Sequence, residues 1–196
     1  MNALLFACLG YLCGSIPFGL LLTRAAGLGD VRSIGSGNIG ATNVLRTGNK
    51  SIAALTLLLD GLKGFIPVFL AFKWAGQDAA LAAAAGAVAG HLFPAWLSFK
   101  GGKGVATAIG VLFGFYWVLG VAFLALWIAA ALVFRFSSLA ALLASAAVPF
   151  IVWALGRHDL LLPTAILGVV IWVMHRENIA RLLRGEESKI SLGGKA

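Results

Sequence analysis

The sequence predicts an all-α, multi-span helical membrane protein. Of its 196 residues, 61% are hydrophobic and only 11% are charged. The apolar residues form repeated runs of about 20, the length that a helix needs to cross a bilayer. Lys and Arg outnumber Asp and Glu by 15 to 7, and the basic residues lie in short segments beside the apolar runs. This distribution sets membrane topology and attracts anionic lipid or phosphate, so we expect no nucleic-acid partner.

The first apolar run, Ala3 to Leu22, is expected to be a membrane span. A signal peptide is the alternative, but no positive segment precedes the run and no cleavage pattern follows it. Positive charge comes after the run instead, at Arg24, Arg32, Arg46 and Lys50. The positive-inside rule therefore predicts an external N-terminus and a cytoplasmic segment after this span. Pro17 predicts a kink within the span.

The next two runs, Ser51 to Phe72 and Asp78 to Phe99, are the second and third predicted spans. Asp60 and Lys63 share one helix face within the second. Two interpretations stay open: a structural ion pair, or a Lys63 ammonium that binds substrate in a polar cavity. In both spans small residues predict close helix packing, and His91 in the third is expected to make a structural hydrogen bond. These small residues are Gly61 and Gly64, and Ala82, Gly86 and Gly90.

The stretch from Val105 to Phe134 has 30 residues without a charge. One helix would be about 45 Å long, too long for a hydrocarbon core of ~30 Å. Two short spans that turn near Phe115 to Gly120 put Arg135 and the basic tail in the cytoplasm. Spans at Ser137 to Leu155 and Leu160 to Met174 follow. The prediction is seven transmembrane helices in a single domain, residues 1–196, with a cytoplasmic C-terminus and a frayed tail after Gly185.

Polar residues gather between the first two spans, in the stretch Gly35-Ser36-Gly37-Asn38-Ile39-Gly40-Ala41-Thr42-Asn43-Val44-Leu45-Arg46. Its three glycines can adopt positive φ, so neighbouring N–H groups could form an anion-binding nest. A short helix from Thr42 to Arg46 would place Asn43 and Arg46 on one face. The guanidinium suits phosphate.

A second polar stretch, Lys100-Gly101-Gly102-Lys103-Gly104, connects the third span to the next helix. It is not a Walker A loop, because the preceding glycine and the following Ser or Thr are missing and a helix comes before it. Glycine would still let backbone N–H groups approach an anion. Lys103 adds a charge, and a helix that starts at Val105 points its N-terminus at the same place. We therefore expect phosphate binding.

The third polar stretch, His175-Arg176-Glu177-Asn178-Ile179, follows the last predicted span. On a helix His175 and Asn178 share a face, and Glu177 is expected to pair with Arg181 at i, i+4. A basic helix end at the membrane surface would account for the arginines. It does not account for His175 or Asn178.

These three stretches, in this order, resemble the signatures of the bacterial acyl-phosphate-dependent glycerol-3-phosphate acyltransferases, and the likeness runs from Gly14 to about Arg184. The resemblance implies an enzyme of phospholipid biosynthesis in the bacterial cell (inner) membrane, with its active site facing the cytoplasm. It implies transfer of a fatty acyl group from acyl phosphate to the 1-position of sn-glycerol 3-phosphate, which gives lysophosphatidic acid. The partners would be the two substrates, the lipid bilayer and a soluble enzyme that supplies acyl phosphate.

The resemblance also implies the site residues. The catalytic group would be Ser36, Arg46, Ser138, His175 and Asn178. The substrate-binding group would be Asn38, Asn43, Lys63, Gly101, Gly102, Lys103 and Gly104. We expect neither a cofactor nor a metal, since no His, Cys or carboxylate cluster suggests one. Either Ser137 or Ser138 could also cap the helix that begins there.

Two alternatives remain, one for the group that accepts the proton in the reaction and one for the class of protein. His175 could be the general base, but we expect the phosphate of the acceptor substrate to take the proton instead. A small anion transporter would also use glycine-lined phosphate sites. Against a transporter, all three polar stretches are predicted on one side of the membrane.

Overall fold

The computed structural model describes residues 3–190, which form helices and loops without a β-strand. The predicted all-α class is therefore confirmed for this part of the chain. The chain divides into two compact units, Met1–Trp117 and Val118–Ala196, and each is described by itself. The single domain expected from the sequence stays a prediction.

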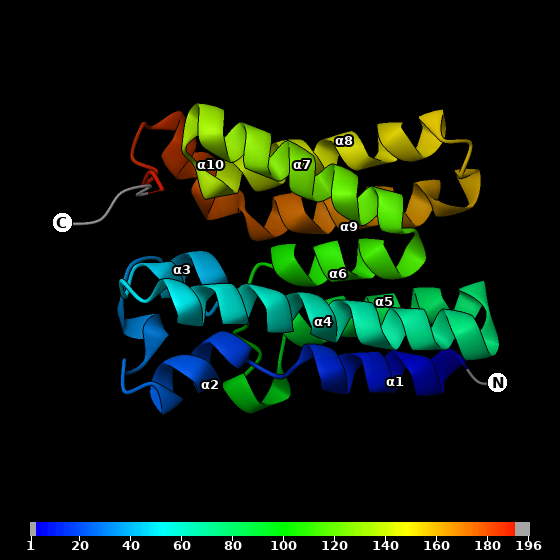
Figure 1. Ribbon diagram of the computed structural model, residues 1–196, viewed down its shortest axis with the longest axis horizontal. Coiled ribbons are helices and arrows are strands. Elements are labelled where there is room, and N and C mark those ends of the chain that lie inside the picture. Colours follow the sequence, from blue (N-terminus) through cyan, green and yellow to red (C-terminus); the bar gives the residue numbers. More distant parts are fainter. Residues whose placement is uncertain (1–2, 191–196) are drawn as a thin grey trace. The chain divides into compact units, whose positions relative to one another are not determined.

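The first unit is built around the long helix α4, which contacts both α5 and α6, while α1 lies along α5 (Figure 1). Its helices are α1 (Ala3–Gly14), α2 (Phe18–Ala25), α3 (Ala41–Leu45), α4 (Lys50–Ala75), α5 (Gln77–Leu92) and α6 (Val105–Phe115). The predicted kink at Pro17 is confirmed, since the chain breaks between α1 and α2. The short α3 agrees with the helix predicted for the first polar stretch.

Small residues allow the helices of this unit to approach closely. A methyl group on Gly86 or Gly90 of α5 would overlap the backbone of α1. On α4 and α6, a methyl group on Gly64 would overlap the Thr107 carbonyl. The packing predicted at these three glycines is therefore confirmed, and α6 is the helix that approaches α4.

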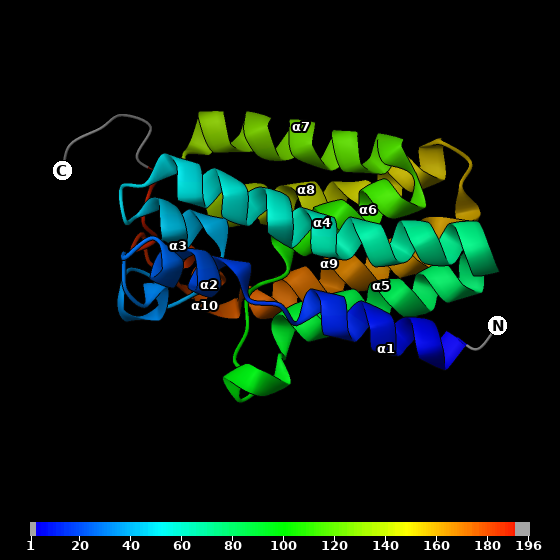
Figure 2. The same ribbon diagram turned by 60° about the horizontal axis from the view of Figure 1, so that its bottom comes forward.

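After α5 the chain makes an excursion through a single 3-10 turn, Ala95–Leu97, before it returns to α6. In Figure 2 the green segment that carries this turn projects past α1. The Tyr11 hydroxyl of α1 donates to the Phe93 carbonyl at 2.8 Å and accepts from the Ala95 N–H at 3.1 Å. The Trp96 indole donates to the Ser15 carbonyl at 2.6 Å. These bonds fix the entry into the glycine-rich second polar stretch.

The second unit contains α7 (Trp117–Phe134), which begins at the unit boundary, α8 (Ser137–Ala154), α9 (Leu161–Met174) and α10 (Arg176–Leu183). Helices α8 and α9 lie side by side (Figure 1). Arg135 has a φ of 63° and marks the end of α7. The segment from His158 to Met174 and the helix α10 are bent by 61° with respect to each other.

Five helical segments in residues 3–190 are long and apolar enough to cross a membrane, and the bent pair would make a sixth. The predicted break within Val105 to Phe134 is confirmed, because α6 ends at Phe115 and α7 begins at Trp117. With 11 residues, α6 is about 16 Å long, shorter than the hydrocarbon core. Seven spans and the orientation of the termini therefore stay predictions.

The tail after α10 differs from the prediction in its described part. Gly185 has a φ of 72°, and the Glu186 N–H reaches back to the Arg181 carbonyl at 2.8 Å. This left-handed glycine turn reverses the chain at the helix end. The following residues are then bonded to the rest of the unit, so a frayed tail is wrong for residues 186–190. Residues 191–196 lie outside the described part.

Candidate active site

The first polar stretch is a loop held together by its own side chains. Gly35 and Gly37 have φ values of 53° and 68°, as predicted, whereas Gly40 has a φ of −80°, so positive φ is wrong there. The reason is that Gly40 is the extended residue that precedes α3. The two left-handed glycines reverse the chain sharply, which backbone with a Cβ rarely does.

Asn43 is the anchor of this loop and is only 2% exposed. Its amide nitrogen lies 2.8 Å from the carbonyls of Val31 and Asn38 and 3.2 Å from that of Ile34. Its amide oxygen accepts from the Ser36 N–H at 3.0 Å. The Asn43 side chain therefore shapes the loop, with both ends bonded to backbone groups.

The loop N–H groups are also used internally. Besides Ser36, the Gly37 N–H donates to the Ile34 carbonyl and the Gly40 N–H donates to Asn38 Oδ1, each at 2.9 Å. A nest of N–H groups directed at an anion is therefore wrong for these three positions. Short amide side chains and turns satisfy the donors locally, as asparagine commonly does.

The exposed polar residues of this motif are Ser36, Thr42 and Arg46. A Cβ at Gly35 would overlap Arg46 Cδ and Nη1 as well as Asn43 Oδ1. Gly35 is therefore required for the arginine to pass so close to the backbone. Asn43 lies within α3 and Arg46 directly follows the last residue of that helix. Of these two residues, only Arg46 is exposed.

The glycines of the second polar stretch serve a purpose other than the predicted one. The N–H groups of Gly101 and Gly102 donate to the Leu92 and His91 carbonyls, each at 3.0 Å. A methyl group on Gly102 would overlap the His91 ring, and one on Gly101 would overlap the His91 carbonyl. The direct N–H contact to an anion is therefore wrong for these two residues. Close approach to the end of α5 explains both glycines.

The rest of the second stretch agrees with the prediction. Gly104 has a φ of 84°, and α6 begins at Val105. Lys103 is half-buried at the start of that helix. Lys103 therefore remains the cationic group at the start of α6.

Asp60, Lys63 and His91 form a buried polar cluster within the first unit. Lys63 Nζ lies 2.6 Å from Asp60 Oδ1 and donates to the Ile16 carbonyl at 2.7 Å. His91 Nδ1 is 4.0 Å from the same carboxylate oxygen, and it makes no hydrogen bond in the described part of the chain. The hydrogen bond predicted for His91 is thus not made by Nδ1. Of the two interpretations of Lys63, this geometry is that of the structural ion pair.

His175 and Asn178 lie together at the start of α10, both buried, as the helix prediction requires. His175 Nδ1 is 2.8 Å from the Ile171 carbonyl. A carbonyl can only accept, so Nδ1 carries the hydrogen, and Nε2 of the neutral ring is an acceptor. The sequence offered no group to orient this ring, and the backbone of α9 provides one.

Glu187 was not predicted as a site residue, yet its carboxylate joins three side chains of the second unit. Its Oε1 accepts from Ser138 Oγ and from Asn178 Nδ2, each at 2.6 Å. Its Oε2 lies 2.7 Å from Arg181 Nε. The Glu187 side chain is 7% exposed. Pairing of Arg181 with Glu177 is therefore wrong, because the reversed tail brings a nearer carboxylate to this arginine.

The charge of Glu187 is maintained by its partners. Burial raises the pKa of this carboxyl, but the hydrogen bonds from Ser138, Asn178 and Arg181 outweigh burial and hold the pKa below its usual value. Glu187 is therefore an anion at neutral pH.

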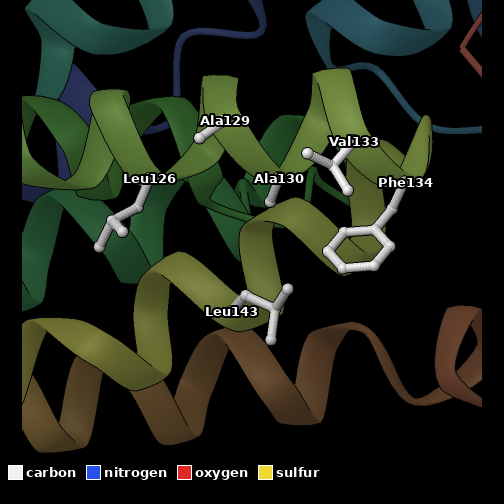
Figure 3. A pocket seen from close by; sticks show the side chains of 6 residues that line it. All are labelled: Leu126, Ala129, Ala130, Val133, Phe134 and Leu143. Carbon is white, nitrogen blue, oxygen red and sulfur yellow. The ribbon is translucent and has the colours of Figure 1, made fainter.

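An apolar groove of about 360 Å³ lies between α7 and α8 (Figure 3). It is lined by Leu126, Ala129, Ala130, Val133, Phe134 and Leu143. Its walls are hydrocarbon, so it suits an acyl chain of a bilayer lipid or of a substrate. Within residues 3–190, no group of three or more His, Cys, Asp or Glu is arranged to hold a metal.

The family profile described as "Glycerol-3-phosphate acyltransferase" matches residues 4–185. A protein of that name from Brucella ovis is 57% identical over 195 residues, which cover 98% of this chain and 96% of the relative. Another from Sinorhizobium fredii is 59% identical over 191 residues, or 97% and 94% of the two chains.

Two solved structures are similar over nearly the whole length. Both are of PlsY (YgiH), an integral membrane glycerol 3-phosphate acyltransferase. The glycerol 3-phosphate form has a TM-score of 0.91 at 38% identity and covers 96% of each chain. The lysophosphatidic acid form has a TM-score of 0.89 at 37% identity and covers 95% of this chain and 94% of that one. The predicted resemblance is thus confirmed, as is a multi-pass membrane protein.

Proposed function

Because this chain belongs to the glycerol-3-phosphate acyltransferase family, we propose that acyl phosphate is its donor and the 1-hydroxyl of sn-glycerol 3-phosphate its acceptor. The product is lysophosphatidic acid, a precursor in phospholipid synthesis. One observation carries this proposal: the chain is similar over 96% of its length to an integral membrane glycerol 3-phosphate acyltransferase that was solved in a glycerol 3-phosphate form. The same enzyme has a lysophosphatidic acid form.

The choice of acyl phosphate rests on the chemistry of the motifs. Each of the first two polar stretches offers a cation, Arg46 and Lys103, and two phosphate-bearing substrates need both. No His is followed five residues later by Asp, the arrangement of soluble-type acyltransferases that use acyl-CoA. An acyl phosphate is already activated, so the enzyme needs mainly to orient the substrates and stabilise the oxyanion. A soluble enzyme would supply this donor.

We assign the side chains by their chemistry. Arg46 and Lys103 bind phosphate, and the exposed Ser36 of the first polar stretch assists Arg46. Ser138, His175 and Asn178 orient the glycerol hydroxyl and the acyl carbonyl. The remaining substrate-binding candidates act by shaping these loops, as their internal hydrogen bonds and close contacts suggest: Asn38, Asn43, Lys63, Gly101, Gly102 and Gly104.

The proton of the attacking hydroxyl goes to the acceptor's own phosphate. A phosphate monoester has a second pKa of about 6, so it can take a proton at neutral pH. His175 would then orient the hydroxyl through Nε2. Glycerol 3-sulfate tests this assignment, because it keeps the shape but is too weak a base. It should bind and barely react, whereas comparable turnover together with an inactive His175→Ala variant would make the histidine the base.

The location we propose is the bacterial inner membrane, with the polar motifs facing the cytoplasm. Seven spans, an external N-terminus and a cytoplasmic C-terminus agree with the positive-inside rule for most basic residues, and the external Arg157 is outnumbered by the cytoplasmic ones. After replacement of Cys8 and Cys13, a cysteine at Ser188 should label only from the cytoplasm and one at Gln77 only from outside. A cysteine at Ser188 that labels from outside would contradict this topology.

The experiment that tests the function offers purified protein glycerol 3-phosphate with acyl phosphate, acyl-CoA or acyl carrier protein in parallel. We expect lysophosphatidic acid acylated at the 1-position from acyl phosphate alone. Turnover with acyl-CoA or the carrier protein at a similar rate would contradict the assigned donor. Absence of product with all three would contradict the function.

A further inference from the structure

We infer that Glu187 is a positioning residue, which fixes the hydroxyl of Ser138 and the amide of Asn178 for the acceptor substrate. This inference rests on the proposed function, because it assigns a role at the site where Ser138 and Asn178 act. Its evidence is the convergence of three donors on one carboxylate, at 2.6 to 2.7 Å. Hydrogen bonds to an ionised acceptor are short and roughly twice as strong as neutral ones.

The tail that carries Glu187 makes hydrogen bonds to the rest of the second unit both before and after this residue. Before it, the glycine turn at Gly185 returns the chain toward α10. After it, the Ile190 N–H donates to the Arg135 carbonyl at 2.7 Å, and Arg135 Nη2 donates back to the Ile190 carbonyl at 3.3 Å. The ammonium of Lys189 lies 5.9 Å from the centre of the Phe136 ring. The carboxylate is therefore held by a strap, defined here as residues 185–190, across the start of α8.

The direction of the Ser138 hydrogen bond decides what that serine can do. A serine has one hydrogen to donate and lone pairs with which to accept. An ionised carboxylate can only accept, so Ser138 gives its hydrogen to Glu187. Its oxygen then remains as an acceptor for the glycerol hydroxyl and cannot serve as a donor to phosphate or carbonyl oxygen.

Asn178 is oriented by the same group. Its Nδ2 faces the carboxylate at 2.6 Å, which fixes which end of the amide is the nitrogen. Arg181 supplies the charge that compensates Glu187, at 2.7 Å on the other carboxylate oxygen. Replacement of the carboxylate removes the charged acceptor of the Ser138 hydroxyl and of the Asn178 amide, so both groups are held less firmly. Misplacement by about 1 Å of groups that orient a substrate can cost about 100-fold in rate.

The test compares the full-length Glu187→Gln variant with wild type in the acyl phosphate assay. We expect kcat to fall between about 10-fold and about 100-fold, while KM for glycerol 3-phosphate changes little, since orientation matters in the transition state. The matched control is Glu186→Gln, because the neighbouring Glu186 pairs with Arg184 and both side chains are more than half exposed. The control should keep the wild-type kcat.

A double-mutant cycle shows whether Glu187 acts through Ser138. In a Ser138→Ala background, Glu187→Gln should lower kcat by a much smaller factor than in wild type. A wild-type kcat for Glu187→Gln, or an equal loss in both backgrounds, would overturn the inference. A higher kcat or a lower KM of Glu187→Gln would also overturn it, because the strap would then compete with the substrate for Ser138 and Asn178. If the wild-type protein forms no lysophosphatidic acid, the proposed function fails instead.

Discussion

Asn43 and Asn178 are both buried asparagines in polar motifs, at 2% and 5% exposure, but their side chains have different partners. The Asn43 amide bonds to backbone groups of its own loop, including the Ser36 N–H. The Asn178 amide donates to Glu187, a charged side chain from the reversed tail. Asn43 therefore stabilises the conformation of its own loop, whereas Asn178 binds the carboxylate of Glu187. The residue type alone does not reveal this difference.

The same contrast applies to the charged groups of the two units. Lys63 in the first unit forms an ion pair with Asp60 and a hydrogen bond to the Ile16 carbonyl. Glu187 in the second unit meets two side chains, Ser138 and Asn178, to which we assign roles in catalysis. We therefore expect changes in the first set to affect stability, and changes in the second set to affect kcat.

The largest effect on stability is expected for Lys63→Met. This change leaves the Asp60 carboxylate buried without its partner, which typically costs about 3–5 kcal/mol in free energy of unfolding. Thermal unfolding in detergent micelles measures the loss. Lys73→Met is the matched control, since Lys73 is exposed near the end of the same helix.

The double variant Asp60→Leu/Lys63→Met sharpens this prediction. It removes both charges, and we expect it to recover most of the stability that Lys63→Met loses. If Lys63→Met unfolds like wild type but raises KM for glycerol 3-phosphate, Lys63 binds substrate and the contrast between the units does not hold.

A smaller loss of stability is expected for Gly102→Ala. The added methyl group meets the His91 ring, and overpacking of this kind typically costs about 1–3 kcal/mol. The second change His91→Ala should make room for the methyl group. The double variant should therefore lose less free energy of unfolding than the two single variants lose in sum. Additive losses would show that the glycine serves another purpose, such as contact with phosphate.

The smallest effect concerns pH. The bonds to Glu187 lower its pKa in the folded state, so its charge stabilises the fold above the ordinary value of 4.5, and this contribution is lost as pH falls below it. The stability difference between wild type and Glu187→Gln should be constant near neutral pH and shrink in acid. Unfolding temperatures measured across this range check the prediction. A difference that grows in acid would contradict the assigned direction.

Hydropathy and charge were sufficient to predict the helical class and part of the helix arrangement, whereas seven spans and the orientation of the termini stay predictions. The break between α6 and α7 followed from the length of the uncharged run and the place of Arg135, and the close packing at Gly86 and Gly90 followed from their spacing. The length of an uncharged run and the spacing of small residues can both be counted along the chain, so a single sequence reveals them.

The candidate site was less predictable because hydrogen-bond partners depend on loop conformation. The sequence places Asn43 beside Arg46 on a helix, but it does not show that four backbone groups surround the amide. Glu187 is not evident from the sequence, because a glycine that ends a helix is equally compatible with a frayed tail. The available signal was Gly185 itself, since a left-handed glycine turn directs the following residues back onto the helix.

The most direct test of the contrast between the two units compares Asn43→Ala with Asn178→Ala. Each variant is purified, and its unfolding temperature, kcat and KM for glycerol 3-phosphate are measured under the same conditions. Asn43→Ala leaves backbone groups without partners, at a cost of about 1–3 kcal/mol for each group that stays buried. It should unfold at a clearly lower temperature and show a raised KM. Asn178→Ala should lose about 100-fold in kcat with a smaller change in unfolding temperature and an unchanged KM. The reverse pattern, with Asn43→Ala stable and Asn178→Ala fully active, would contradict the account.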